Sequence, residues 1–207
     1  MLDKNGMTEE QFLNSYRPGD YPRPSLTADV ALFSRESEEL RLLMIRRGGH
    51  PHIGKLALPG GFAQSGEDLY ATARRELMEE TGAEVSEIYE VGQFSAPGRD
   101  KRGWVISVLY SAIVDACRVI AGDDARSAEW YPIRISREGN TLLVMILAEE
   151  SIELEYTLKR VDDPLGIRYS ISDEIKNSDA LAFDHGMMIG RAIERMGLIP
   201  EDNRCTR

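Results

Sequence analysis

Residues 61–83, GFAQSGEDLYATARRELMEETGA, carry the strongest structural signal in the chain of 207 residues. An α-helix turns by about 100° per residue, and on that spacing the segment has one apolar stripe, which predicts a helix over residues 67–81. Ser65 and Asp68 form a capping-box-like pair at its beginning, and Gly82 stands at its end, where a left-handed residue is favoured. The stripe consists of Leu69, Tyr70, Ala73 and Leu77.

Three carboxylates lie close together on this predicted helix. Glu76, Glu79 and Glu80 project within about one third of its circumference, and Glu80 falls at the edge of the apolar stripe. A carboxylate beside the core is costly unless it is paired, and clustered carboxylates repel one another. A divalent cation such as Mg²⁺ or Mn²⁺ removes both penalties. The alternative is a solvated acidic face that pairs with Arg74 and Arg75, as exposed helices often do.

The same segment resembles the Nudix box, Gly-x5-Glu-x7-Arg-Glu-U-x-Glu-Glu-x-Gly-U, in which U is a bulky aliphatic residue. Only the last position departs, because Ala83 is smaller than the usual residue. The resemblance implies an α/β (α+β) fold, a three-layer α/β/α sandwich around a mixed sheet. The matching positions are Gly61, Glu67, Arg75, Glu76, Leu77, Glu79, Glu80 and Gly82.

The resemblance also implies roles for these residues. A magnesium ion, or alternatively manganese, would neutralise a pyrophosphate group and activate a water molecule. The implied ligands are Glu76, Glu80, Glu79 and the carbonyl of Gly60. Arg75 would orient the carboxylates, so that the implied catalytic group is Glu76, Glu79 and Arg75. Glu67 would hold Arg75, and Gly61 and Gly82 would have structural roles.

A second resemblance points to one branch of the family. The segments that carry it resemble ADP-ribose pyrophosphatases and also the repressors of NAD biosynthesis that contain a Nudix domain. Pro97 lies fifteen residues beyond Gly82, as in the ADP-ribose subgroup, and a basic cluster follows it. We expect phosphates to dock there, on Pro97, Arg99, Lys101 and Arg102, although the charges also fit an ordinary surface. The segments are Tyr21–Phe33, Phe94–Tyr110, Gly122–Tyr131 and Leu181–His185.

Five further polar residues are considered for the reaction, for its control or for the structure of the site. The acidic loop before Trp130 offers Asp124 and Glu129 as the catalytic base. His185 is interpreted as a structural residue rather than a catalytic one, since a single histidine without a partner carries little information. His50, together with His52, could gate the site.

The chain is expected to form one Nudix domain, residues 25–207, after an extended lead-in, residues 1–24. A departure from the family pattern over residues 135–178 predicts an inserted β-hairpin, with arms at 141–148 and 152–159, before a helix near the end of the chain. One face of its second arm is apolar and must be covered by the same chain or by a second subunit. Further strands are predicted at residues 26–33, 40–46, 55–58, 88–94 and 104–114.

The composition limits the possible partners. A formal net charge of −10 and a pI near 4.9 disfavour binding to nucleic acid. The two cysteines, Cys117 and Cys205, predict no disulfide framework, and no segment is apolar enough for a signal or a membrane span. We therefore expect a cytoplasmic protein, and a homodimer because the family often dimerises through its N-terminal segment.

Three functions remain open at this point. The first is hydrolysis of a nucleoside diphosphate derivative, with ADP-ribose giving AMP and ribose 5-phosphate. The second is hydrolysis of damaged nucleoside triphosphates, and the third is a non-catalytic sensor of ADP-ribose. The complete set of carboxylates favours an enzyme, and only 22 residues follow His185, which leaves no room there for a DNA-reading module.

Overall fold

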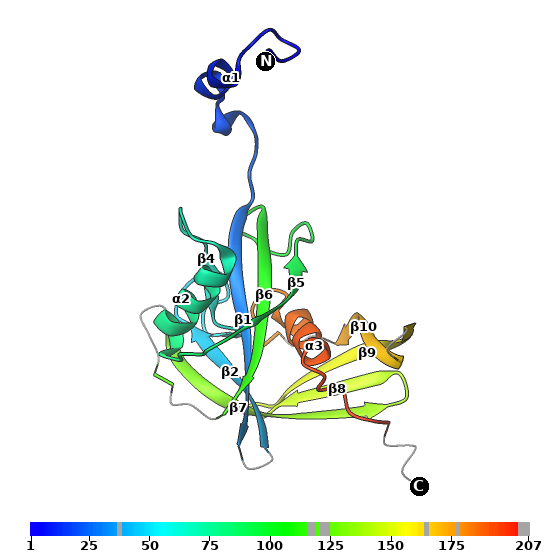
Figure 1. Cartoon of the computed structure of the whole chain (residues 1–207). Helices are drawn as coiled ribbons and strands as arrows, with labels where there is room; N and C mark the ends of the chain where they lie inside the picture. Colours follow the sequence, from blue (N-terminus) through cyan, green and yellow to red (C-terminus); the bar gives the residue numbers. More distant parts are fainter. Residues whose placement is uncertain (37–38, 116–118, 121–124, 164–165, 177–178, 203–207) are drawn as a thin grey trace.

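The computed structural model describes residues 1–36, 39–115, 119–120, 125–163, 166–176 and 179–202. Its centre is one sheet in the order β10-β9-β8-β7-β2-β1-β6-β5, with β3 beside β2 and β4 beside β1 (Figure 1). The pair β1 and β6 is parallel and the other pairs are antiparallel, so the sheet is mixed, as predicted. The strands are β1 Ser25–Glu36, β2 Glu39–Arg47, β3 Leu56–Ala57, β4 Gly60–Phe62, β5 Tyr89–Phe94, β6 Val105–Val114, β7 Ala125–Glu138, β8 Thr141–Ile146, β9 Ile152–Asp163 and β10 Gly166–Lys176.

Two helices cover the two faces of this sheet. Alternate residues of β1 point to opposite faces, so Val30 and Leu32 belong to one apolar cluster and Ala31 and Phe33 to another. Helix α2, Leu69–Thr81, adds Ala73 and Leu77 to the first cluster. Helix α3, His185–Arg195, packs on the second cluster through Met188, Ile189, Ala192 and Ile193. The three-layer α/β/α arrangement is therefore confirmed.

The ends of α2 show which local signals were interpreted correctly. Gly82 has φ 65°, and its N–H donates to the carbonyl of Met78, so the predicted left-handed end is confirmed. The predicted beginning was wrong, because Asp68 and not Ser65 is the N-cap. Its carboxylate accepts a hydrogen bond of 2.7 Å from the N–H of Ala71.

The predicted hairpin is present as β8 and β9, and its apolar face is covered by the same chain. Its buried residues include Leu154 and Tyr156, and the Tyr156 hydroxyl donates to the carbonyl of Gly186 in α3. A Cβ atom on Gly190 would lie 2.7 Å from the Tyr156 ring, so this helix and β9 are in close contact. A second subunit is not needed to cover this face.

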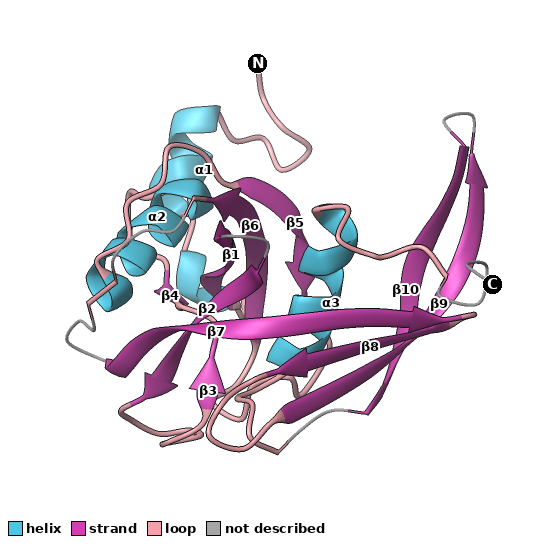
Figure 2. Ribbon diagram, turned by 90° about the horizontal axis from the view of Figure 1, so that it is seen from below, coloured by secondary structure: helices cyan, strands magenta, loops and turns pink. Residues whose placement is uncertain are grey.

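Two strands of this region were not predicted from the sequence. Strand β7 pairs with β2 through its first part and with β8 through its last part, so it spans both halves of the sheet (Figure 2). Strand β10 was not predicted, because its sequence GIRYSISDEIK mixes polar residues into the apolar alternation.

The N-terminal segment stands away from the rest of the molecule (Figure 1). It was expected to be extended, but it contains helix α1, Glu9–Ser15, and a short 3-10 turn, Pro18–Asp20. The reason is a capping box that the prediction overlooked, in which Thr8 and Gln11 bond each other's backbone. No residue of α1 is buried. None of the described helices is long and apolar enough to cross a membrane.

Candidate active site

A cleft of about 760 Å³ lies where α2 meets the glycine turn at β4. Helix α2 contributes Glu76 and Glu80 to its lining, and Gly60 and Gly61 form the turn. A smaller pocket of about 50 Å³ shares this glycine turn and continues toward Asp29 in β1. The cleft thus brings together the acidic helix and the glycines that the sequence motif contains.

Glu80 is the buried carboxylate of this cleft, with only 7% of its surface exposed. One carboxylate oxygen accepts a hydrogen bond of 2.9 Å from the N–H of Gly60. Burial raises the pKa of Glu80 to about 8, and the negative charges of Glu76 and Asp29 contribute, while the hydrogen bond from Gly60 opposes the shift. Because its charged form is so disfavoured, this position favours a cation nearby.

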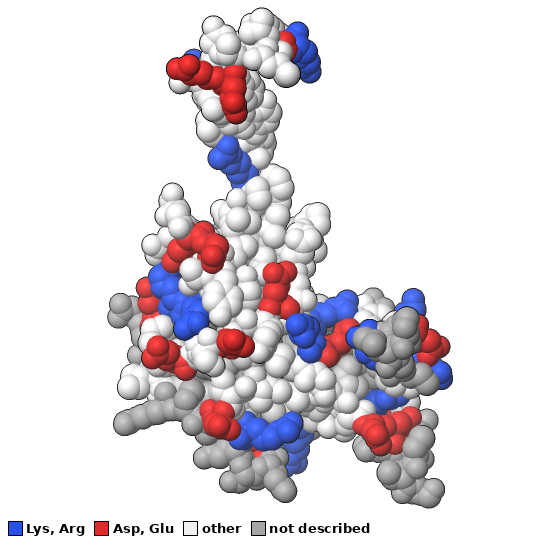
Figure 3. Space-filling view, in the orientation of Figure 1, with Lys and Arg blue, Asp and Glu red and all other residues white. Residues whose placement is uncertain are grey.

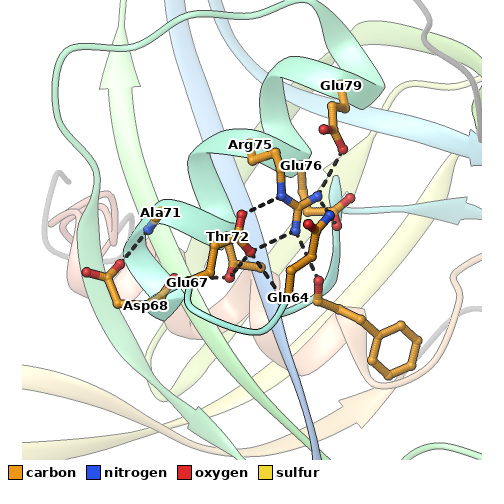
Figure 4. A network of polar contacts seen from close by, with 9 residues as sticks. Gln64, Glu67, Asp68, Ala71, Thr72, Arg75, Glu76 and Glu79 are labelled. Atoms are coloured by element: carbon orange, nitrogen blue, oxygen red, sulfur yellow. Dashed lines mark hydrogen bonds and ion pairs between the residues drawn. The ribbon is translucent and has the colours of Figure 1, made fainter.

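Arg75 ties the other carboxylates of the motif together (Figure 4). Its Nε donates to Glu67 over 2.6 Å, and its Nη1 donates to both Glu76 (2.7 Å) and Glu79 (2.9 Å). Its Nη2 reaches Glu67 and the carbonyl of Phe62. The hydrogen bonds that Arg75 donates lower the pKa of Glu67 to about 2, and their acceptance by Glu67, Glu76 and Glu79 raises the pKa of Arg75. Arg75 therefore orients Glu76 and Glu79 while Glu67 fixes Arg75.

The two glycines of the turn are required by close contacts. A Cβ atom on Gly61 would lie 2.5 Å from the carboxylate of Glu76, and one on Gly60 would lie 2.4 Å from the carbonyl oxygen of Ala28. Any larger residue at these positions must therefore move either a carboxylate or the strand β1.

We expect Gly61→Ala to lower turnover by about 10²-fold, since a displacement near 1 Å in an active site has an effect of this size. The added methyl group pushes Glu76 away while the fold survives, because the contacting atoms are the end of a side chain. Steady-state kinetics with thermal unfolding would check this. Gly19→Ala, in the N-terminal turn outside the cleft lining, is the control because a Cβ atom there meets nothing, and a loss of activity equal in both variants would contradict the prediction.

The donor chemistry of the cleft fits a hard divalent cation. Glu76 and Glu80 are carboxylates, and Gly60 offers a backbone oxygen beside them. Within the described ranges, however, no three side chains among His, Cys, Asp and Glu are already placed around a common metal position. The reason is visible in the contacts, since Glu76 and Glu79 turn toward Arg75 while Glu80 turns toward Gly60. Glu79 is also the most exposed of the three, at 57% for its side chain.

The predicted phosphate-binding loop is only partly brought to the cleft. Arg102 lines it, but Pro97 and Lys101 are exposed and lie outside its lining residues. Arg99 lines only the smaller pocket, and its guanidinium makes two hydrogen bonds, of 2.9 and 2.6 Å, to Asp184, so its binding of phosphate stays a prediction. Its side chain is only 5% exposed, so its charge is already used in holding the loop to α3.

Of the two candidates for the catalytic base, the structure describes only Glu129. Glu129 is exposed in β7, opposite Met44 of β2, and lies outside the residues that line the cleft. Asp124 falls outside the described residues, as do the cysteines Cys117 and Cys205.

Several residues of the site were not predicted from the sequence. Arg47 and Phe62 line the cleft, while Asp29 and Phe183 line the smaller pocket beside it. The local signals were the pair of glycines that follows Arg47 and the position of Phe62 directly after Gly61 of the motif. These side chains come from distant segments, which the sheet register brings together.

The histidines have different surroundings. His185 is buried, and its Nδ1 accepts a hydrogen bond of 2.9 Å from the N–H of Leu58, which fits the structural role expected of it. Burial lowers its pKa. Its Nε2 lies 3.7 Å from Asp29, whose other oxygen accepts from the hydroxyl of Ser107. His50 lines the cleft, and a gating role for His50 and His52 stays a prediction.

Comparison with known proteins identifies the family. A family model described as NUDIX domain matches residues 24–138, more than half of the chain, and the chain therefore belongs to the Nudix family. The crystal structure of a MutT/nudix family protein from Enterococcus faecalis superimposes with a TM-score of 0.71 at 32% identity. That match covers 92% of this chain and 70% of the other.

Two curated relatives point to the ADP-ribose branch. The ADP-ribose pyrophosphatase of Methanocaldococcus jannaschii is 35% identical over 113 residues, which cover 55% of this chain and 64% of the relative. The ADPR responsive transcriptional repressor NtrR of Acinetobacter baylyi is 39% identical over 116 residues, 55% of this chain and 46% of the relative. The chain thus matches only about half to two thirds of the length of these relatives.

A solved complex adds a ligand to this comparison. The NUDIX domain of Shewanella oneidensis NrtR, complexed with ADP ribose, superimposes with a TM-score of 0.58 at 32% identity. The match covers 61% of this chain and 84% of that domain. The resemblance to the branch that contains ADP-ribose pyrophosphatases is therefore confirmed, and Nudix hydrolases generally use a divalent metal such as Mg²⁺.

Proposed function

We propose that this protein hydrolyses the pyrophosphate bond of ADP-ribose, giving AMP and ribose 5-phosphate, with Mg²⁺ as its cation and Mn²⁺ as a substitute. The observation that carries the proposal is the buried Glu80 beside Glu76 in an open cleft. Two neighbouring carboxylates of this kind cost free energy when no cation neutralises them, whereas with a bound cation they can support hydrolysis. The likeness to an ADP-ribose pyrophosphatase and to a domain complexed with ADP ribose supports the choice of substrate.

The proposal gives each residue of the cleft a task. Glu76 and Glu80, with Glu79 and the carbonyl of Gly60, would hold the cation. The cation neutralises the pyrophosphate and activates a water molecule when bound. Arg75 holds Glu76 and Glu79 in place by hydrogen bonds, so that the ligands need little rearrangement on binding.

A substrate panel tests the proposal directly. The purified chain would be incubated with ADP-ribose, NADH, diadenosine polyphosphates and nucleoside triphosphates, first with Mg²⁺ and then with Mn²⁺. We expect AMP and ribose 5-phosphate from ADP-ribose at the highest kcat/KM, and no reaction after chelation of the metal. Faster hydrolysis of the triphosphates would replace this proposal with the housecleaning function.

A second candidate function is sensing of ADP-ribose without turnover. The observation that favours it is the 39% identity to an ADPR responsive transcriptional repressor. The face in Figure 3 shows basic side chains next to acidic ones, so it offers a duplex no continuous basic surface. The absence of a nucleic-acid partner nevertheless stays a prediction, and tight binding of ADP-ribose with inertness toward the whole panel would favour the sensor.

We also propose that the protein is a cytoplasmic homodimer and that its N-terminal segment forms the dimer interface. Phe12, Tyr16 and Tyr21 contact one another through their rings, with centroids 5.7 and 6.1 Å apart, yet all three are exposed. Leu13 on the same helix is exposed as well. Neighbouring apolar side chains that remain exposed in their own chain are suited to covering a second copy.

We expect the double variant Phe12→Ser with Leu13→Ser to shift the protein from dimer to monomer. The reason is that these two side chains supply most of the exposed apolar surface of α1. Light scattering after size-exclusion chromatography would measure the mass, with Glu10→Gln on the same helix as the matched control. A wild-type monomer at working concentration would refute the homodimer.

A further inference from the structure

Phe183 lies just before α3, and its ring contacts side chains from three other segments. Its backbone has φ 49°, in the left-handed region that bulky residues rarely adopt. The guanidinium carbon of Arg47 lies over the ring at 5.0 Å from its centroid, and that of Arg102 lies at 5.3 Å. The ring of His52 packs edge-on at 4.7 Å. Phe183 thus adopts an unusual backbone conformation while its ring contacts the guanidinium groups of two arginines that line the cleft.

Arg102 is fixed by contacts on several sides. Its guanidinium lies over the ring of Phe62 at 4.6 Å and faces Phe183 as well. The buried Asp100 accepts hydrogen bonds from its Nε (3.1 Å) and its Nη2 (2.7 Å). Cation–π contacts and a charged pair together restrict a side chain that would otherwise move freely in the loop. Its charge nevertheless remains part of the cleft lining.

Arg47 reaches the same place from the end of β2. Its Nε donates a hydrogen bond of 2.9 Å to the carbonyl of Pro51, which fixes the direction of the side chain. Burial lowers the pKa of Arg47, and the positive charge of Arg102 lowers it further. Two cations held this close repel each other, although Glu80 and Asp29 offset part of the repulsion. An anion that enters the cleft relieves it.

The other basic residues of the loop do not share this arrangement. Arg99, paired with Asp184, lines the smaller pocket but not the cleft, and Lys101 is exposed outside the lining of both. Arg47 and Arg102 are therefore the guanidinium groups that line both the cleft and the pocket beside it.

We propose that Arg47 and Arg102, held by the ring of Phe183, form the anion-binding side of the cleft and take the diphosphate of the substrate. Phe183 is then a positioning residue, which acts on the substrate through the two arginines. Guanidinium groups suit this task because they bind phosphate oxygens in pairs of hydrogen bonds. The inference rests on the proposed function for the identity of the diphosphate as that of ADP-ribose.

The first test uses inorganic pyrophosphate as the probe, with binding measured by calorimetry in the absence of metal. We expect Arg47→Gln and Arg102→Gln each to weaken binding by about tenfold or more, as the loss of a charged hydrogen bond predicts. Arg134→Gln removes one charge at a separate cavity and should bind as the wild type does. Wild-type affinity in both arginine variants, or no binding of pyrophosphate by the wild type, would overturn the inference.

The second test concerns Phe183. Phe183→Leu keeps an apolar side chain but removes the ring, and Phe183→Tyr keeps the ring. We expect Phe183→Leu to weaken pyrophosphate binding and to raise the KM for ADP-ribose more than it lowers kcat. Phe183→Tyr should retain the wild-type pyrophosphate affinity and the wild-type KM. A Phe183→Leu variant that unfolds more readily but binds pyrophosphate normally would show a merely structural role and would overturn the assignment.

The two proposals fail in different ways. If the arginines bind pyrophosphate and ADP-ribose is not hydrolysed, the proposed function is wrong and the anion-binding side stands. If ADP-ribose is hydrolysed with an unchanged KM in both arginine variants, the function stands and this inference is wrong.

Discussion

Glu80→Gln is expected to lower the rate of ADP-ribose hydrolysis by about 10²- to 10³-fold, the usual effect of removing one charge-stabilising group from an active site. The same change should stabilise the metal-free protein near neutral pH. The amide keeps an oxygen that can accept the hydrogen bond from Gly60 but carries no buried charge. A variant that loses activity and gains stability has lost a functional group rather than its fold.

The pH dependence of this stabilisation has a definite sign. The pKa of Glu80 is about 8 in the folded protein, against the ordinary glutamate value of 4.5 that applies to the unfolded chain. Between these values the folded protein holds a proton that the unfolded chain has released, so wild-type stability falls as pH rises through the window. The variant lacks this fall. Its advantage should be absent below about pH 4.5 and reach a few kcal/mol, as an order of magnitude, by about pH 8.

Thermal unfolding in EDTA from pH 4 to 9, together with kinetics in Mg²⁺, would measure both effects. Addition of Mg²⁺ should raise the Tm of the wild type and leave that of Glu80→Gln nearly unchanged, since a ligand stabilises the state that binds it. Glu84→Gln, an exposed residue just beyond α2, is the control and should change neither property. Equal turnover in Glu80→Gln and the wild type would remove Glu80 from the metal site.

The acidic helix could be predicted from sequence because its information is local. The spacing of Glu76, Glu79 and Glu80 follows from the helical repeat alone, and Gly82 marks the end of the helix by its backbone conformation. The arginine network is almost as local, since Glu67 and Arg75 are eight residues apart. The contacts within this segment depend little on the rest of the chain.

The other side of the cleft could not be predicted, because its geometry depends on segments far apart in the chain. Arg99 and Arg102 are three residues apart and chemically identical, yet Arg99 pairs with Asp184 whereas Arg102 lines the cleft. That difference depends on a residue 85 positions away. Arg47 and Phe183 meet only after β2 and the segment before α3 are in place. No spacing rule along the chain reports such a contact.

The hairpin and the strand after it show the same distinction. In β9 the alternation of Leu154 and Tyr156 with polar residues is a local pattern of period two, and it predicted both the strand and its buried face. Strand β10 is held by its pairing with β9 and by a hydrogen bond from the N–H of Ile171 to Glu194 of α3. These are tertiary contacts, so its own sequence is a weak guide.

Arg75→Gln is expected to lower turnover by about 10- to 100-fold, the typical effect of losing a group that orients metal ligands. Glutamine cannot replace a guanidinium that bonds Glu67, Glu76 and Glu79 together. Glu76 and Glu79 then repel each other without a cation between them, and the motif loses its arrangement. Binding of metal should weaken with turnover, because both depend on the same carboxylates.

The neighbouring arginine provides a matched control for this prediction. Arg74 has the same chemistry one position earlier, but it donates to the carbonyl of Ser86, lies over the ring of Tyr70 and is not part of the cleft lining. Arg74→Gln should therefore retain turnover. Titration of Mg²⁺ or Mn²⁺ against activity would separate a weaker metal site, corrected by high metal, from a damaged fold, which metal does not correct. If the two variants lost activity equally, the network would be no more than surface pairing, and the carboxylates would be oriented by something other than Arg75.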